Sequence, residues 1–156
     1  AWSKLVELLS PVVQLAKEEG IMLVVETGNN AMITSCFLGK KLIDDLETTH
    51  LKVLWDPANA LYCGENPSKN ALDSMVGGYL GHVHMKDVEV SIHQATIKCV
   101  ALGEGQMAPH LSIIAERLND IDYKGSMSLE SVYRPSGGDF EDGFQASIST
   151  FINLFS

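Results

Sequence analysis

Two histidines stand two residues apart in the stretch GHVHMKD at residues 81–87, which ends in a lysine and an aspartate. Side chains alternate between the two faces of a β-strand, so His82 and His84 would share one face if this stretch is a strand. Its polar end would then lie at the carboxyl edge of a sheet, where α/β proteins bind ligands. The plainer alternative is a buried strand with one satisfied histidine and a solvated turn.

Three acidic residues occupy the same position in other apolar stretches, because Glu26, Asp56 and Glu130 each stand at or near the end of a predicted strand. Three carboxylates and the imidazole of His84, brought together, would repel one another. A divalent cation removes that conflict, and mixed oxygen and nitrogen ligands suit Mn²⁺, Mg²⁺, Co²⁺ or Zn²⁺. Each carboxylate alone could equally cap a helix or form a surface ion pair. The repetition on four strands favours a shared metal site.

The elements that would position these residues alternate along the chain. Unbroken apolar runs, typical of parallel strands covered on both faces, lead to each of the four polar residues. Helical periodicity fills the intervals. The expected helices cover residues 1–20 (two short helices or one kinked at Pro11), a stretch around 38–46, roughly 68–76, 108–118 and 140–155. Residues 88–105 are less regular, with hairpin character indicated in 91–100.

Four strand–helix units, mostly about 30 residues apart, match the spacing of the (β/α)8 TIM barrel. An open doubly wound sheet is the alternative, and both architectures place functional groups at the carboxyl ends of the strands. A full barrel needs about 250 residues, whereas the chain has 156. We therefore expect an α/β fold of the TIM-barrel type in which this chain forms about half of the barrel.

The charge balance limits the partners of the chain. It has 11 lysine and arginine residues against 20 aspartate and glutamate residues, a formal net charge of −9. A protein that wraps nucleic acid needs a basic surface to neutralise phosphates, so we expect no nucleic-acid partner. One or two local cations could still hold a small anionic substrate.

The three cysteines, Cys36, Cys63 and Cys99, are odd in number and lack CxxC spacing. This pattern favours free thiols in a reducing, cytoplasmic compartment over a disulfide framework or a zinc knuckle. No apolar run approaches the roughly 18 residues of a membrane span, so we expect no membrane association. The first residues, AWSKL, show neither an initiator Met nor a signal-peptide layout, and we expect a fragment that begins within a helix.

Five short motifs carry a resemblance to a known family: VE at 25–26, WDPAN at 55–59, GHVHMKD at 81–87, LGEG at 102–105 and SLE at 128–130. Their order and spacing resemble the xylose-isomerase-like TIM-barrel superfamily. That group contains sugar and sugar-phosphate isomerases and epimerases, inosose and dehydroshikimate dehydratases, and family-2 AP endonucleases. The resemblance implies that residues 1–156 form the C-terminal half of a single barrel domain, strands five to eight.

Carried over position by position, the resemblance implies that the family's four metal ligands fall on Glu26, Asp56, His84 and Glu130. The second histidine of the pair matches the ligand, so His82 becomes a neighbour deeper in the barrel. In epimerases of this family the two ligand glutamates also work as acid and base on opposite faces of the substrate carbon. The resemblance therefore implies that Glu26 and Glu130 exchange a proton α to a carbonyl.

Four side chains are candidates for substrate binding: Asn59, His82, Lys86 and Arg134. AP endonucleases of the family have a histidine where Asn59 stands, which together with the acidic charge makes DNA repair a poor match. Several epimerases also use histidine there, so the substrate class stays open. Lys86 could hold a substrate oxygen or phosphate, or could pair with its neighbouring acid. Arg134 is either an anion contact or a plain surface residue.

The leading hypothesis is a metal-dependent isomerase or epimerase that acts on a small-molecule sugar or sugar phosphate. A dehydratase of a keto-polyol or dehydroshikimate-like substrate is the nearest alternative, because proton abstraction by a metal-bound glutamate serves both reactions. A third alternative is a truncated half barrel that is inactive alone. Its two open sheet edges and apolar interior would need cover, either by self-association or by a missing N-terminal half.

Overall fold

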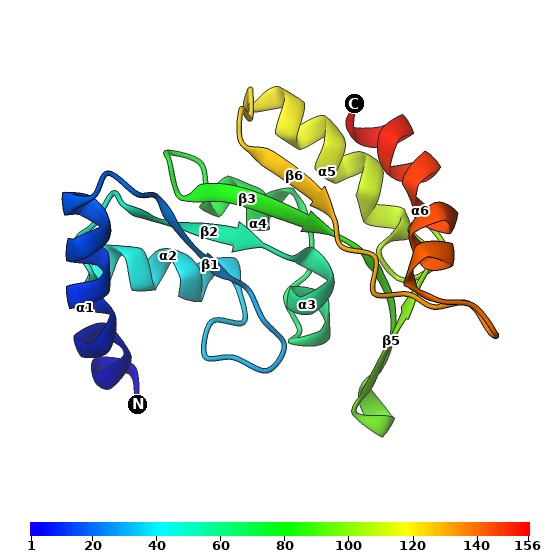
Figure 1. Ribbon diagram of the computed structural model, residues 1–156, viewed down its shortest axis with the longest axis horizontal. Helices are drawn as coiled ribbons and strands as arrows, with labels where there is room; N and C mark the ends of the chain where they lie inside the picture. The colour runs from blue at the N-terminus through cyan, green and yellow to red at the C-terminus, as the bar shows by residue number, and fades with distance from the viewer.

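Four parallel strands form the main sheet of the computed structural model, which describes residues 1–156 (Figure 1). They are β1 (Leu23–Glu26), β2 (Leu51–Trp55), β3 (Leu80–Met85) and β6 (Ser126–Leu129), in the spatial order β1-β2-β3-β6. The order in space follows the order in the chain. A doubly wound sheet reverses its strand order at a switch point, whereas a barrel does not. The expected α/β class with a parallel sheet is confirmed, and the strand order favours the barrel topology.

Helices and one hairpin complete the chain. The helices are α1 (Trp2–Glu18), α2 (Cys36–Asp45), α3 (Pro57–Tyr62), α4 (Lys69–Ser74), α5 (Ala108–Asp120) and α6 (Phe140–Phe155). Strands β4 (Asp87–Ser91) and β5 (Thr96–Val100) pair antiparallel around a 3₁₀ turn, η1 (Ile92–Gln94). Figure 1 shows this hairpin projecting away from the sheet just after β3. None of the helices combines the length and apolar character that crossing a membrane requires.

The two faces of the sheet differ in burial. On β2 the residues Leu51, Val53 and Trp55 are buried, and they alternate with half-buried ones. Trp55 is fully buried in the core, on the side of the sheet that the helices cover. The opposite face is partly open to solvent, as the 45% exposure of Val24 shows. Strands β1 and β6 each pair on one side only, so the sheet has two free edges.

Helix α2 packs closely on this sheet at a glycine. A Cβ atom on Gly39 would lie 2.7 Å from Cγ2 of Val53, so only a glycine lets the helix approach the strand at this point. The N-terminus of α2 is held by Ser35, whose hydroxyl accepts a hydrogen bond from the Leu38 amide. Local capping and close packing together place the loop between β1 and α2 beside the carboxyl ends of the strands.

Three elements differ from the sequence-based expectations. Helix α1 runs unbroken through Pro11, and the Ser10 hydroxyl donates to the Val6 carbonyl instead of capping a new helix. Helix α3 was not expected, although Asp56 as N-cap and Pro57 as first helical residue are a known start signal. The hairpin begins at Asp87, earlier than residues 91–100, because β4 follows β3 after a single residue.

Candidate metal centre

Four side chains meet at the carboxyl ends of the parallel strands: Glu26, Asp56, His84 and Glu130. Each offers one ligand atom, and these four atoms all lie within 4.8 Å of one another. Bonds of about 2.0–2.2 Å place opposite donors of a bound cation roughly 4.0–4.4 Å apart, so the set fits a divalent cation after a small side-chain adjustment. The strand register brings these residues together. Glu26 lies opposite Leu54, which precedes Asp56 by two residues, and His84 lies opposite Ser128, which precedes Glu130 by two residues.

Asp56 is the most enclosed member, with a side chain that is 0% exposed. Its Oδ1 accepts from the backbone N–H of Asn59 at 2.9 Å, which caps α3, and its Oδ2 accepts from the Asn59 amide at 2.8 Å. Burial raises the pKa of Asp56, and the neighbouring ammonium of Lys86 opposes that rise. Asp56 therefore caps helix α3 and also belongs to the cluster of candidate ligands.

Lys86 lies among the carboxylates of the cluster. Its Nζ is 2.6 Å from Asp56 Oδ2 and 2.5 Å from Glu130 Oε2, and its side chain is 10% exposed. Burial lowers the pKa of Lys86, but the ion pairs with these two acids outweigh burial and raise it overall. The ammonium is therefore charged at neutral pH. Of the two alternatives for Lys86, pairing with its neighbouring acid is wrong, because the Asp87 carboxylate accepts from backbone groups instead.

The Asp87 side chain instead binds backbone N–H groups. It is 1% exposed, and its carboxylate accepts four backbone N–H groups, from Val88, Gly103, Gly105 and Met107, at 2.8–2.9 Å. A buried carboxylate with four donors has its hydrogen-bonding capacity filled. The loop that carries the LGEG motif is thereby tied to Asp87, which follows His84 and Lys86 in the chain.

The histidine pair shares one face, and the two rings have different surroundings. The His84 Nδ1 atom is buried without a hydrogen-bond partner, 3.5 Å from Glu26 Oε1 and 3.8 Å from Glu130 Oε2. A buried ring nitrogen without a partner, aimed at two carboxylates, suits metal ligation. His82 lies edge-on to His84, and its Nε2 is 2.9 Å from the Ser128 hydroxyl. Burial and the nearby His84 both lower the pKa of His82.

Two further predicted substrate contacts have partners within the chain. The Asn59 amide also lies 3.4 Å from Glu26 Oε1, so it links Glu26 to Asp56. Arg134 is exposed, and its guanidinium lies over the Phe140 ring at 4.0 Å from the centroid. Asn59 therefore orients two members of the cluster, whereas Arg134 forms no ion pair with any of them.

Thr27 was not among the residues singled out from the sequence, yet it supports the cluster. Thr27 is 0% exposed, and its hydroxyl accepts from the Asp56 N–H at 2.8 Å and donates to the Asp56 carbonyl at 3.2 Å. The hydroxyl thus joins the end of β1 to the end of β2. A threonine directly after a predicted strand was the available signal, but its partner is far away in the sequence.

Thr27→Val is expected to lower the free energy of unfolding by about 1–3 kcal/mol, because the Asp56 N–H and carbonyl lose a buried partner. Valine keeps the shape of the side chain, so packing changes little. Thr27→Ser retains the hydroxyl and is the matched control. Urea denaturation followed by circular dichroism measures both variants. Equal midpoints for the valine and serine variants would show that the hydroxyl contributes no stability.

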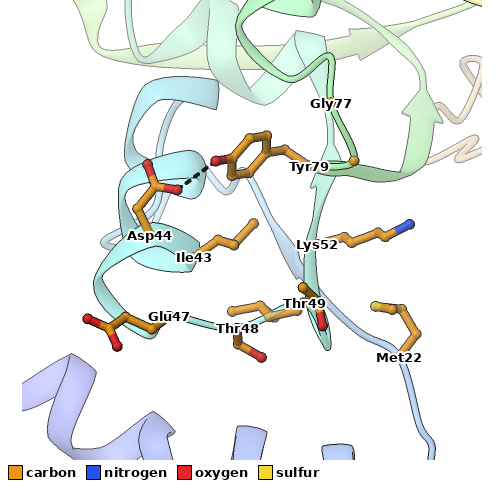
Figure 2. Close-up of a pocket in the computed structure, with 11 residues that line it drawn as sticks. Met22, Ile43, Asp44, Glu47, Thr48, Thr49, Lys52, Gly77 and Tyr79 are labelled. Atoms are coloured by element: carbon orange, nitrogen blue, oxygen red, sulfur yellow. Dashed lines mark hydrogen bonds between the residues drawn. The ribbon is translucent and has the colours of Figure 1, made fainter.

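A separate cavity of about 610 Å³ lies at the opposite end of the sheet. Its lining includes Met22, Ile43, Asp44, Lys52 and Tyr79, and Figure 2 shows the Tyr79 hydroxyl donating to Asp44. None of the predicted site residues lines it. The amino-terminal end of a barrel generally serves stability, whereas chemistry occurs at the carboxyl end. The cluster, and not this cavity, is therefore the candidate site.

A family model described as a xylose isomerase-like TIM barrel matches residues 1–154. The chain belongs to this family. The predicted resemblance is therefore confirmed, and the carboxyl-end cluster of this xylose isomerase-like chain lies where barrels of all kinds place their chemistry. No curated protein matches the chain.

Solved structures share the xylose isomerase-like fold of the chain. A xylose isomerase domain protein from Planctomyces limnophilus has a TM-score of 0.75 at 23% identity, over 97% of this chain and 51% of its own. D-psicose 3-epimerase with D-tagatose from Clostridium cellulolyticum H10 gives 0.74 at 22% identity, over 99% and 56%. The IOLI protein with a binding zinc atom gives 0.74 at 17% identity, over 96% and 54%. The chain thus spans about half the length of these proteins.

Proposed function

We propose that this chain supplies the metal-binding side of the active site of a sugar or sugar-phosphate isomerase or epimerase. The observation that carries the proposal is the convergence of three carboxylates and the unpartnered His84 Nδ1 at the carboxyl ends of four adjacent strands. Mn²⁺, Mg²⁺, Co²⁺ and Zn²⁺ all suit such mixed oxygen and nitrogen donors. When bound, the cation would supply Lewis-acid polarisation of a substrate carbonyl.

Glu26 and Glu130 are the proposed acid–base pair, and their position supports this role. Glu26 ends β1 and Glu130 directly follows β6, and these are the two outer strands of the sheet, so the two glutamates approach the cluster from opposite sides. Their side chains are 40% and 33% exposed, whereas Asp56 is fully buried. Of the three carboxylates, only the two glutamates can therefore touch a substrate. One would remove the proton α to the carbonyl, and the other would return a proton on the opposite face.

A small polyhydroxylated substrate suits the surroundings of the pair. The net charge of −9 disfavours polyanions, and Lys86 offers one local cation for a substrate oxygen or a single phosphate. Dehydration of a keto-polyol begins with the same proton abstraction. Asn59 does not separate the two substrate classes, because it stands where several epimerases of the family have a histidine. Incubation in D₂O separates the two reactions, because an epimerase returns deuterated ketose whereas a dehydratase releases an enone product.

We further propose that residues 1–156 correspond to strands five to eight, the C-terminal half of one barrel domain. The half-length match to the solved structures and the free edges of β1 and β6 support this placement. A second four-stranded unit, either an N-terminal half or another copy of the chain, would complete the mouth. All three cysteines are free, which supports a reducing, cytoplasmic location.

Metal binding is the first test of the proposed function. Mn²⁺ added to chelator-treated protein is expected to raise the melting temperature, and at 100 times the dissociation constant the stabilisation would reach about 2.7 kcal/mol. His84→Ala should abolish the shift because it removes the nitrogen donor. His93→Ala, which alters an exposed histidine of the hairpin turn, is the control. An unchanged melting temperature of the parent protein at millimolar Mn²⁺ would contradict the proposed metal site.

A further inference from the structure

Lys86 is the only lysine or arginine that forms an ion pair with the acids of the cluster. Its ammonium contacts Asp56 Oδ2 and Glu130 Oε2 at once, at 2.6 and 2.5 Å. These two acids belong to different strands, so one cation links the ends of β2 and β6 across β3. Without Lys86, the three carboxylates of the cluster would face one another with no positive charge among them.

The hydrogen bonds of Asp56 fill the acceptor sites of its Oδ2 atom. A carboxylate oxygen has about two acceptor sites. Oδ2 already accepts from the Asn59 amide and from Lys86, and Oδ1 accepts from the backbone of α3. A cation that binds through Oδ2 therefore has to replace one of these donors. The Asn59 amide is fixed by the short helix that Asp56 itself caps, whereas Lys86 has a flexible four-carbon stem.

Glu130 presents the same conflict. The oxygen that contacts Lys86, Oε2, is also the one that lies 3.8 Å from His84 Nδ1. A cation held jointly by His84 and Glu130 would share this oxygen with the ammonium. Like charges repel strongly in a largely enclosed site. A divalent cation bound to His84 and Glu130 would therefore be repelled by the Lys86 ammonium, if the ammonium kept its present contact with Glu130.

We propose that Lys86 is a displaceable internal counter-cation, which holds Asp56 and Glu130 in place until a divalent cation binds and releases it. The inference rests on the metal site of the proposed function. The released ammonium stays tethered beside the cluster, where it can reach an oxygen of the bound substrate. Lys86 is thus a positioning residue of the metal-free protein and a competitor of the metal.

Mn²⁺ affinity, measured by calorimetry on the chelator-treated protein, tests the competition. Lys86→Met is expected to bind Mn²⁺ roughly tenfold more tightly than the matched control, a difference of about 1.4 kcal/mol. The control is Lys52→Met, which removes the same charge from a half-buried lysine of β2 that forms no ion pair. In chelator, Lys86→Met should melt at a lower temperature than Lys52→Met, because its carboxylates have lost their counter-cation.

The outcomes separate the two proposals. If the parent protein binds no Mn²⁺, the metal site and the proposed function fail. If the parent binds Mn²⁺ but Lys86→Met binds it no more tightly than Lys52→Met, only the counter-cation is overturned. Should Lys86→Met not fold without metal, the ¹⁵N signal of the Lys86 ammonium in the parent protein decides the question. Zn²⁺ should shift or broaden this signal, and an unchanged signal at saturation would overturn the proposal.

Discussion

Glutamine in place of Glu130 is expected to lower the turnover of a ketose or ketose phosphate by about 10²–10⁴-fold, the usual contribution of a general acid or base. An amide keeps the size of the side chain but can neither accept nor deliver the proton. Glu26→Gln should reduce turnover by a similar factor, since the two carboxylates flank the cluster from the outer strands. The rates are compared at saturating Mn²⁺, with metal occupancy measured for each variant.

The two variants should differ in their partial reactions. With one epimer as substrate in D₂O, the variant that keeps the base still exchanges the α-proton, whereas the other variant does not; proton NMR follows the exchange. Glu89→Gln is the control, because Glu89 lies on the hairpin with a side chain that is 56% exposed. If all three glutamine variants turn over substrate equally, the acid–base assignment is wrong.

Asp87→Asn is expected to destabilise the protein by about 3 kcal/mol or more, although the two side chains have the same shape. All four partners of Asp87 are backbone N–H groups, so an amide would turn its own N–H₂ toward two donors. Both of these donors would stay buried and unsatisfied. Chemical denaturation with linear extrapolation measures the loss.

The matched control is Asp122→Asn. The Asp122 side chain is 80% exposed, and its positive φ of 51° suits asparagine. This substitution should leave stability within about 0.5 kcal/mol of the parent. A similarly small effect of Asp87→Asn would mean that the loop at residues 103–107 does not depend on the buried carboxylate.

The sequence predicted the convergence of the four polar residues because two simple rules govern it. Side chains alternate along a strand, and parallel strands end at one edge. His84 and the three acids each stand at such an end, so their approach needed no knowledge of packing. The closing helix at residues 140–155 followed from equally local periodicity, and its observed bounds are Phe140–Phe155. Whether the four residues bind metal stays a prediction.

The partners of individual side chains could not be predicted in this way. Lys86 and Asp87 are adjacent and opposite in charge, which suggested a local pair. In the structure Lys86 reaches two acids that lie far away in the sequence, and Asp87 turns to backbone donors of a later loop. Thr27 was overlooked for the same reason. The partner of a buried polar side chain depends on which donors and acceptors the folded chain brings next to it. The order of residues in the sequence does not contain that information.

The four candidate ligands lie in or directly after four different strands, so no short segment of the chain contains the set. In the unfolded chain the donors are dispersed, and the affinity for a cation is thermodynamically linked to folding. A substitution that loosens strand pairing would therefore weaken apparent metal binding without touching a ligand. Screens that rank variants by metal content would report such folding defects as ligand defects, unless the melting temperature of each metal-free variant is measured alongside.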